Sequence, residues 1–469
     1  MAKFYIEQFG CRATQADGAA IERQLREQGS VAAADAASAD VVVLNTCTVT
    51  AAADTQARDA IRKIHAANPS TRIIVTGCYA QRAPEELAAL AGVSFVVGNS
   101  HKPQIPKLLH SITGPQADGA ALSIVGVEQN PRSSQGNLPA RILTGDIFHL
   151  TDVLVAPVLG GEGNHTRPTL KIQDGCNSRC SFCVIPFVRG RSRSLPPKTV
   201  LCELRRLTDS GFREIVLSGI NLGTYGRDLC PQVGFLDLLE RILGETSVER
   251  LRISSIEPLD VTQDLIRLFA SSDRIAPHFH MPLQSASDRM LAAMHRWYRA
   301  EHYARRVALI HEHLPDAAIG ADVIAGFPGE TEADHAATLN FIESRPFTYL
   351  HIFSYSSRPG TKSAALARQL PGHIIKHRAR ELRALADLKS AAFRQSQLGR
   401  TLRVLTLRRD PAGGSSCTPA LSGNYLTVQL PVSVPPNHFL EATISHVGDN
   451  RVLATPLESS VFALSSDLR

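Results

Sequence analysis

Short apolar runs of β type alternate with longer helical stretches through the first 110 residues of the chain. "KFYIEQFG" precedes "AAIERQLREQG", "VVVLNTC" precedes "ADTQARDAIRKIHAAN", "RIIVTGC" precedes "PEELAALAG", and "FVVGN" follows. Strands separated by helices at this spacing are joined as βαβ units of a parallel sheet. The sequence therefore predicts an open parallel-sheet α/β domain over residues 1–110.

Three cysteines stand where the first three of these strands end. Cys11 follows "KFYIEQFG", Cys47 closes "VVVLNTC" and Cys78 closes "RIIVTGC". In an open parallel sheet the ligand crevice lies beyond the carboxyl ends of the strands. We therefore expect these three cysteines, distant in the sequence, to form one site.

A second alternating block begins at "TLKIQDG" and continues with "EIVLSGI", "RLRISSI", "FHMPLQS", "IGADVIAGF" and "YLHIFSYS". Six βα units predict a partial, open (β/α)6 barrel over residues 166–396, with its active face at the carboxyl ends of the strands. The preceding segment, residues 111–165, is rich in turn residues. It is predicted to be a connector with one short strand around "GDIFHL".

The C-terminal part, residues 397–460, contains the short strand patterns "LRVLTL", "NYLTVQL", "FLEATISHV" and "RVLATPL". Strands of this length, separated by turn residues, predict a small antiparallel β-barrel of the OB-like kind. Barrels of this size commonly bind oligonucleotides.

Composition places the 469-residue chain among globular proteins, with 43% hydrophobic and 20% charged residues. A membrane-spanning run and a signal-type N-terminus are both missing, which predicts a cytoplasmic location and no membrane partner. Nine cysteines, an odd number, argue against a disulfide framework and leave reduced thiols for metal.

Positive charge is concentrated towards the C-terminus. Between Lys376 and Arg409 ten basic residues stand against two acidic ones, so this segment carries +8 while the whole chain carries +6. The segment is therefore predicted to meet an anionic polymer through its phosphates.

The densest cysteine motif is "DGCNSRCSFCVIPFVRGRSRS", in which Cys176, Cys180 and Cys183 fall within eight residues. A closed zinc or cluster site takes four protein ligands, and no fourth ligand follows nearby. An incomplete zinc site and a cluster with one open iron both fit the motif. Its place after the first strand of the predicted barrel favours a catalytic site with an open position.

The C-x3-C-x2-C triplet, with Phe182 before its last cysteine, resembles the signature of the radical S-adenosylmethionine (SAM) enzymes. This resemblance implies a 4Fe-4S cluster on Cys176, Cys180 and Cys183, whose fourth iron binds SAM. The cluster would then reduce SAM to the radical that activates a carbon without an acidic proton.

"FGC", "LNTCTVT" and "TGCYAQ" resemble the N-terminal domain of the methylthiotransferases within that superfamily, and the C-terminal barrel resembles the RNA-binding TRAM domain. The resemblance implies a second 4Fe-4S cluster on Cys11, Cys47 and Cys78, and two SAM molecules in each reaction. It also implies tRNA, through its anticodon stem-loop, as a partner, together with a sulfur source and an electron donor such as a flavodoxin or ferredoxin.

"LSGINLGTYG", "RISSIEP", "HFHMPLQS" and "IGADVIAGFPGET" look most like the branch that methylthiolates carbon 2 of N6-threonylcarbamoyladenosine at tRNA position 37. The alternatives within this chemistry are isopentenyladenosine in tRNA and an aspartate of a ribosomal protein. From another class, an RNA-binding iron–sulfur redox sensor remains open. Thr14, Ala286 and Leu195 depart from the family pattern.

The resemblance also implies a set of SAM contacts at or near the strand ends. Phe182 would pack on the SAM adenine, Ser218 and Gly219 would end the second strand, and Glu257 and Gln284 would end the third and fourth. The full set of implied SAM contacts is Phe182, Ser218, Gly219, Glu257, Gln284, Asp322 and Gly326.

Two further groups of side chains are predicted from their positions. Arg189, Arg191 and Arg193, beside the triplet, are expected to contact tRNA phosphates or SAM. His278, His280 and His351 are interpreted as hydrogen-bonded residues inside the barrel rather than as acid–base groups.

Overall fold

The structure, a computed structural model, describes residues 2–113, 140–158, 166–409, 417–449 and 451–459. Its chain divides into two compact units. The first is formed by Met1–Val158, Leu170–Ser194 and Ser356–Ala364, and the second by Leu159–Thr169, Leu195–Tyr355 and Ala365–Arg469. The predicted domain boundaries at residues 110, 165 and 396 stay predictions.

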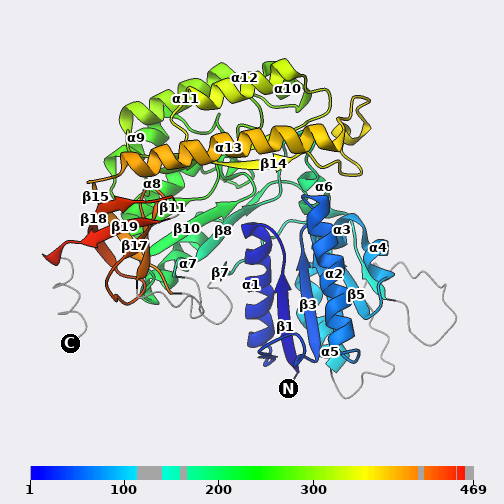
Figure 1. Cartoon of the computed structure of the whole chain (residues 1–469). Helices are drawn as coiled ribbons and strands as arrows, with labels where there is room; N and C mark the ends of the chain where they lie inside the picture. The colour runs from blue at the N-terminus through cyan, green and yellow to red at the C-terminus, as the bar shows by residue number, and fades with distance from the viewer. Residues whose placement is uncertain (1, 114–139, 159–165, 410–416, 450, 460–469) are drawn as a thin grey trace. The chain divides into compact units, whose positions relative to one another are not determined.

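The first unit is built on a six-stranded parallel sheet with the strand order β2-β1-β3-β4-β5-β6 (Figure 1). The open parallel α/β architecture predicted from the alternating runs is thereby confirmed. Its strands are β1 (Lys3–Gln8), β2 (Val31–Ala32), β3 (Val41–Thr46), β4 (Arg72–Gly77), β5 (Val93–Gly98) and β6 (Arg141–Leu143).

Helices cover both faces of this sheet, because its central strands are apolar on both sides. Val41 and Val43 pack with Leu25 and Leu108 on one face. Val42 and Leu44 point the other way and pack with Ile61. The helices are α1 (Arg12–Glu27), α2 (Ala51–Ala67), α3 (Cys78–Arg82), α4 (Pro84–Ala88) and α5 (Ile105–Thr113), with a 3-10 turn η1 (Asn99–Gln104).

The strand predicted at "GDIFHL" is wrong. Residues Ile147–His149 form the 3-10 turn η2, because the Asp146 side chain accepts a hydrogen bond from the backbone N–H of Phe148 at 2.9 Å and starts a turn. The strand of this region is β6, a few residues earlier. Most of the predicted connector, 114–139 and 159–165, lies outside the described residues.

The first unit also contains the segment with the cysteine triplet. β8 (Thr169–Asp174) leads into the triplet loop, which is followed by α6 (Ile185–Arg189) and β9 (Arg193–Ser194). β9 returns antiparallel to β8, with Gln173 opposite Ser194. A two-residue strand β7 (Pro157–Val158) precedes them.

The second unit carries the other parallel strands of the predicted barrel. β10 (Glu214–Gly219) pairs with β11 (Arg250–Ile253), and β13 (Ala318–Ala325) lies between β12 (His278–His280) and β14 (Tyr349–Ser354). The helices around them are α7 (Pro197–Asp209), α8 (Phe235–Glu245), α9 (Gln263–Ser271), α10 (Asp288–Ala293), α11 (Ala300–His313), α12 (Glu332–Glu343) and α13 (Gly372–Ser396), with a 3-10 turn η4 (Leu222–Thr224). The 3-10 turn η5 (Lys362–Ala365) belongs almost wholly to the first unit.

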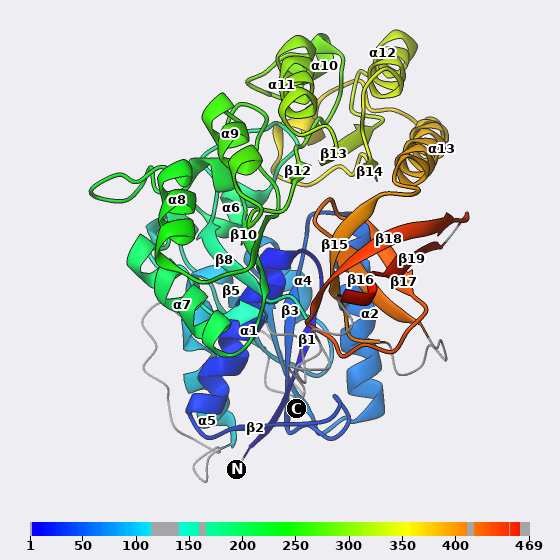
Figure 2. The same cartoon turned by 90° about the vertical axis from the view of Figure 1, so that its left-hand side faces the viewer.

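The C-terminal strands close into a barrel in the order β15-β16-β17-β19-β18 (Figure 2). The predicted small barrel is confirmed, with two corrections. β17 and β19 pair in parallel, at Gln429 and Leu453, so the barrel is not wholly antiparallel. The strand β16 was missed. The strands are β15 (Thr401–Thr406), β16 (Thr418–Ser422), β17 (Thr427–Leu430), β18 (Phe439–Val447) and β19 (Val452–Pro456).

One buried carboxylate in the second unit gathers three arginines. Glu214 is fully buried, and its Oε1 lies 2.8 Å from Arg252 Nε and 3.2 Å from Arg167 Nη1. Its Oε2 lies 3.4 Å from Arg250 Nη1. Arg252 also donates to the carbonyls of Ser422 and Gly423 at 3.0 and 2.9 Å. Glu214 therefore offsets part of the positive charge of the arginines through which β11 binds the C-terminal barrel.

We expect Glu214→Ala to destabilise the protein by about 3–5 kcal/mol, because it leaves buried guanidinium groups without their counter-ion. Glu245→Ala is the matched control, since Glu245 pairs with Arg241 at an exposed position. Thermal unfolding followed by circular dichroism should show a large fall in Tm for the first variant and little change for the second. Equal Tm values would contradict this role of Glu214.

Candidate functional site

The first site gathers Cys11, Cys47 and Cys78 at one edge of the six-stranded sheet. β3 lies between β1 and β4, with Gln8 opposite Asn45 and Thr46 opposite Gly77. Cys11 caps the N-terminus of α1, Cys47 directly follows β3, and Cys78 is the first residue of α3. The fold thus places the three cysteines beyond the carboxyl ends of adjacent strands, where the strand pattern predicted them.

Gly10 is needed at this edge because nothing larger fits. Its φ of +101° lies in the left-handed region, and a Cβ there would stand 2.3 Å from Cys47 Cβ and 2.8 Å from Cys47 Sγ. The turn after β1 therefore presses its backbone against Cys47.

The surroundings of Cys47 affect how this edge would bind the irons of a cluster. Burial, followed by the nearness of Cys78 and Cys11, raises the pKa of the Cys47 thiol to about 12. Thiols must lose their protons to bind iron, so the positive charge of the irons would replace those protons. Thr14 Oγ1 lies 3.5 Å from Cys11 Sγ, and Asn99 Nδ2 donates to Cys78 Sγ at 3.6 Å. Such contacts to sulfur tune an iron–sulfur cluster.

The second site is the loop of Cys176, Cys180 and Cys183, all half-buried. Ser178 donates its backbone N–H to Cys176 Sγ at 3.3 Å, and Cys183 donates its backbone N–H to the carbonyl of Cys180 at 3.1 Å. The loop closes tightly at Gly175, whose φ is +70° and where a Cβ would stand 2.0 Å from the carbonyl oxygen of Arg191. A pre-folded loop of accessible thiols fits a cluster with three protein ligands.

A buried ion network joins the elements that carry the two cysteine sites, and the sequence analysis missed most of it. Asp17 on α1 lies 2.7 Å from Lys102 Nζ and 3.0 Å from Arg189 Nη2, and it also contacts Lys171. Asp174 lies 2.8 Å from Lys171 Nζ and 2.9 Å from Arg189 Nη1. All five side chains are buried. We call Asp17, Lys102, Lys171, Asp174 and Arg189 the buried ion network.

Arg189 is the member that reaches the cysteines. Burial acts to lower its pKa, but Asp174, Cys78, Asp17 and Cys11 outweigh burial and raise the pKa well above the usual value. For Asp17, burial acts to raise the pKa, while Lys102, Lys171 and Arg189 lower it well below its usual range. The network is therefore ionised, with three cations against two anions.

The predicted role of Arg189 and Arg193 at tRNA phosphates or SAM needs correction. Both side chains are buried, and Arg193 donates to the carbonyl of Arg189 at 2.9 Å. They are held inside because Asp174, at the end of β8, attracts both. Arg191 alone of the three is exposed.

The basic segment from Lys376 to Arg409 is used partly inside the protein. Arg378 is buried and lies 2.8 Å from Glu330 Oε2, while Arg403 lies 3.1 Å from Glu249 Oε2. The exposed cations of α13 that remain candidates for phosphate contact are Lys376, Arg380 and Arg383.

The residues of the second unit that are predicted to contact SAM differ in burial and in the elements that they pack against. Ser218 is buried, and Gly219 ends β10. Gly326, with φ of +78°, faces Ile375 of α13, because a Cβ there would stand 2.6 Å from Ile375 Cγ1. Phe182, in the triplet loop of the first unit, is half-buried. The roles of these residues at SAM stay predictions.

The sequence predicts that Glu257 ends a strand, and this is wrong, whereas Gln284 forms a parallel β-bridge with Val323 just beyond β12. β11 stops at Ile253, and Glu257 lies beyond it, paired with Arg296, with its pKa raised by burial. β12 spans His278–His280, and beyond it Met281 and Leu283 still donate their backbone N–H groups to the carbonyls of Gly320 and Asp322, at 2.9 and 3.1 Å. Gln284 has φ of +62° and donates its backbone N–H to the carbonyl of Asp322 at 2.8 Å.

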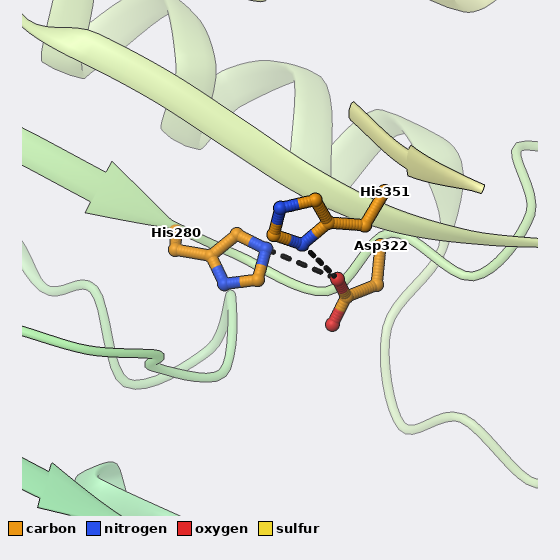
Figure 3. Close-up of side chains that lie close together, drawn as sticks. All are labelled: His280, Asp322 and His351. Carbon is orange, nitrogen blue, oxygen red and sulfur yellow. Dashed lines mark hydrogen bonds and ion pairs between the residues drawn. The ribbon is translucent and has the colours of Figure 1, made fainter. Parts of the chain in front are cut away.

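Asp322 is engaged by two histidines (Figure 3). His280 Nε2 and His351 Nδ1 lie 3.1 and 3.2 Å from its Oδ1. Burial acts to raise the pKa of Asp322, but the two imidazoles lower it well below its usual range. Of the residues that the structure describes, these are the three potential metal-ligand side chains whose ligand atoms all lie within 4.8 Å of one another.

The histidine interpretation is confirmed for His278 and wrong for His351. His278 is buried and shares a hydrogen bond of 2.7 Å with the Tyr349 hydroxyl. His351 is hydrogen-bonded to Asp322, but 55% of its side chain is exposed, because its own strand β14 is an edge strand of the sheet. It is therefore available to a ligand.

Two family descriptions match the chain. Residues 3–98 match "Uncharacterized protein family UPF0004", and residues 170–342 match the radical SAM superfamily. The first covers the sheet with Cys11, Cys47 and Cys78, and the second begins at β8 and includes the cysteine triplet.

The chain is 37% identical over 409 residues to threonylcarbamoyladenosine tRNA methylthiotransferase MtaB of Aquifex aeolicus, covering 87% of this chain and 93% of that protein. The chain belongs to the radical SAM tRNA methylthiotransferases. It is also 36% identical to MtaB of Bacillus subtilis, over 86% of this chain and 85% of that protein. To tRNA-2-methylthio-N(6)-dimethylallyladenosine synthase of Sphingopyxis alaskensis it is 33% identical over 463 residues, 97% of each chain.

Membership in this family means that the chain is an enzyme and that it uses SAM with a 4Fe-4S cluster. Among solved structures, the radical SAM methyltransferase TsrM of Kitasatospora setae matches with a TM-score of 0.54 and 14% identity, covering 79% of this chain and 80% of that chain. This likeness concerns the fold alone. In the described part of the chain, every helix is too short or too polar to cross a membrane.

The close packing at Gly10 generates a prediction about iron content. We expect Gly10→Ala to lose iron after anaerobic reconstitution, because its Cβ would displace Cys47 from the other two cysteines. Gly29→Ala is the matched control, since Gly29 also has a positive φ, +82°, but nothing lies within 4 Å of a Cβ there. Iron analysis and visible absorption should show the loss only in Gly10→Ala; equal iron in both variants would contradict it.

Proposed function

We propose that this chain methylthiolates carbon 2 of N6-threonylcarbamoyladenosine at tRNA position 37, with two SAM molecules and two 4Fe-4S clusters. One cluster would be held by Cys176, Cys180 and Cys183. The other would be held by Cys11, Cys47 and Cys78.

The observation that carries this proposal is the gathering of Cys11, Cys47 and Cys78 at one sheet edge. A radical SAM enzyme needs one three-cysteine site to activate SAM. A second such site therefore indicates a second chemical role. When bound, the clusters would supply an electron for SAM cleavage and a site for the sulfur that is transferred. The protein's own residues hold the thiols together, exclude water around Cys47 and Cys78, and donate hydrogen bonds to sulfur.

The choice of nucleoside rests on the relatives. Two proteins named for threonylcarbamoyladenosine match at 37% and 36% identity and a third at 32%, while the proteins named as dimethylallyladenosine synthases match at 32% to 35%. The isopentenyl-type substrate is therefore the second candidate. A ribosomal-protein substrate and a redox sensor without catalysis have less support, because neither matches the names of these relatives.

The proposed methylthiolation requires an electron donor, a sulfur source and a tRNA substrate as partners. An electron donor such as a flavodoxin or ferredoxin would reduce the cluster of the triplet, and a sulfur source would restore the sulfur used in each turnover. The exposed cations Lys376, Arg380 and Arg383 are the proposed contacts to tRNA phosphates.

A strain lacking the gene tests the substrate. Mass spectrometry of its tRNA nucleosides should show loss of the 2-methylthio form of threonylcarbamoyladenosine and accumulation of the unmodified form. Loss of the isopentenyl form instead would replace the first candidate by the second. No change in either nucleoside would sink both.

Complementation with cysteine variants tests the division of labour between the two sites. Cys180→Ala should lose both SAM cleavage and methylthiolation. Cys47→Ala should still release 5′-deoxyadenosine but form no methylthio product. Cys202→Ala is the control, because Cys202 is an exposed thiol on α7 outside both sites. Full methylthiolation by Cys47→Ala would exclude a role for the second site.

A further inference from the structure

One face of the β12–β13–β14 sheet is polar. On β13, Ile319, Ala321, Val323 and Ala325 are buried in the core. Side chains alternate along a strand, so Asp322 lies on the opposite face. The neighbouring strands place their own polar residues on that face, which we call the polar face: His278, His280, Asp322, Tyr349 and His351.

The polar face is closed at one end and open at the other. His278 is 5% exposed and stacks on Tyr425 of the C-terminal barrel, with ring centroids 4.5 Å apart. Exposure of the side chain then rises from 12% at His280 to 23% at Asp322 and 55% at His351. Among the residues of the polar face, His351 is therefore the most accessible to a ligand.

Asp322 orients the His351 ring. Its ionised carboxylate only accepts hydrogen bonds, so the ring nitrogen that faces it, Nδ1, must be the N–H donor, at 3.2 Å. Nε2 then lies on the far side of the ring, away from Asp322 (Figure 3). His280 contacts the same Asp322 oxygen, Oδ1, at 3.1 Å, so the Asp322 carboxylate is held between the two imidazole rings.

We propose that His351, positioned by Asp322 and His280, recognises the polar substituent on N6 of the target adenosine and so selects threonylcarbamoyl over isopentenyl. This inference rests on the proposed function. The threonylcarbamoyl group offers a hydroxyl, N–H groups and a carboxylate, whereas the isopentenyl group is hydrocarbon. A binding site whose polar side chain hydrogen-bonds the substrate discriminates strongly against an apolar analogue of that substrate, because the analogue leaves the side chain without a hydrogen-bond partner.

The test uses the reconstituted holoenzyme with two anticodon stem-loops, one carrying threonylcarbamoyladenosine and one isopentenyladenosine. His351→Phe should lower kcat/KM for the first roughly 10- to 100-fold and leave that for the second unchanged or higher. His351→Gln, which keeps hydrogen-bonding groups, should recover most of the loss. His311→Phe is the control, because His311 is an exposed histidine on the outer helix α11.

The outcomes separate the two proposals. An unchanged preference in His351→Phe, with wild-type enzyme active on threonylcarbamoyladenosine, would overturn the role of His351 alone. A wild-type enzyme inactive on that stem-loop would overturn the proposed function. A similar loss in His351→Phe and His311→Phe would also count against a specific role.

A separate observation concerns Trp297, the single tryptophan of the chain, which is 78% exposed. It lies between α10 and α11, and both of its neighbours are anchored. Arg296 is buried and paired with Glu257, while the buried Tyr298 donates its hydroxyl hydrogen to the carbonyl of Leu283 at 2.9 Å. These anchors fix the backbone on both sides of Trp297, and its indole lies in solvent.

We infer that Trp297 is a stacking platform for an unpaired base of the tRNA substrate. An indole face binds any base, and Arg299, which is half-buried and donates to the carbonyls of Arg296 and Tyr298, adds a cation beside Trp297 that suits a polyanion. A single ring offers far less area than a stable protein interface needs. Nucleic acid is therefore the partner that the side chain suits.

Because Trp297 is the only tryptophan, its fluorescence reports this contact directly. Titration of the holoenzyme with the stem-loop should quench it, and Trp297→Ala should weaken stem-loop binding roughly 5- to 150-fold. Trp297→Phe should retain part of the affinity. Phe148→Ala, which removes another exposed aromatic ring, is the control and should bind as wild type. Tight stem-loop binding without quenching, or with wild-type affinity in Trp297→Ala, would overturn the inference.

Discussion

The buried ion network is the interaction on which the first unit depends. Asp17 belongs to α1, Lys171 and Asp174 belong to β8, and Arg189 ends α6. Removing ions from water is costly, and the cost is offset only when every charge meets a partner at close range. The network therefore restrains α1, which Cys11 caps, and the β8–α6 segment, which holds the triplet, to one arrangement.

The same network sets the charge around the cysteines. Cations outnumber anions there, the more so because the buried Arg193 also faces Asp174, and Arg189 is within electrostatic reach of Cys78 and Cys11. A cluster with three thiolate ligands brings negative charge from its sulfurs, so a cation behind it lowers the cost of burial. Thr14, fully buried between Cys11 and Arg189, links the two electrostatically.

Much of the candidate site was predictable from local patterns. The triplet is contiguous in sequence, and the positions of Cys11, Cys47 and Cys78 follow from strand ends, because parallel neighbouring strands finish at one edge. The sequence-based predictions were wrong for side chains whose contacts lie far away in the sequence. Arg189 was predicted to be a surface cation, but it is buried because it pairs with Asp17 and Asp174. His351 was predicted to be a core residue, but it is exposed because its strand lies at the edge of the sheet. "GDIFHL" has strand-like residues, but a side-chain contact of Asp146 turns it.

By itself, the sequence determined the order of strands and helices, the two sets of three cysteines and the family, because periodicity and short motifs are local properties of the chain. Only the tertiary structure decided which charges are buried and which remain available. It turned Arg189 and Arg378 inward, left Trp297 and His351 in solvent, and set the two histidines on Asp322. Burial and charge pairing depend on residues far apart in the sequence, so no local pattern contains them.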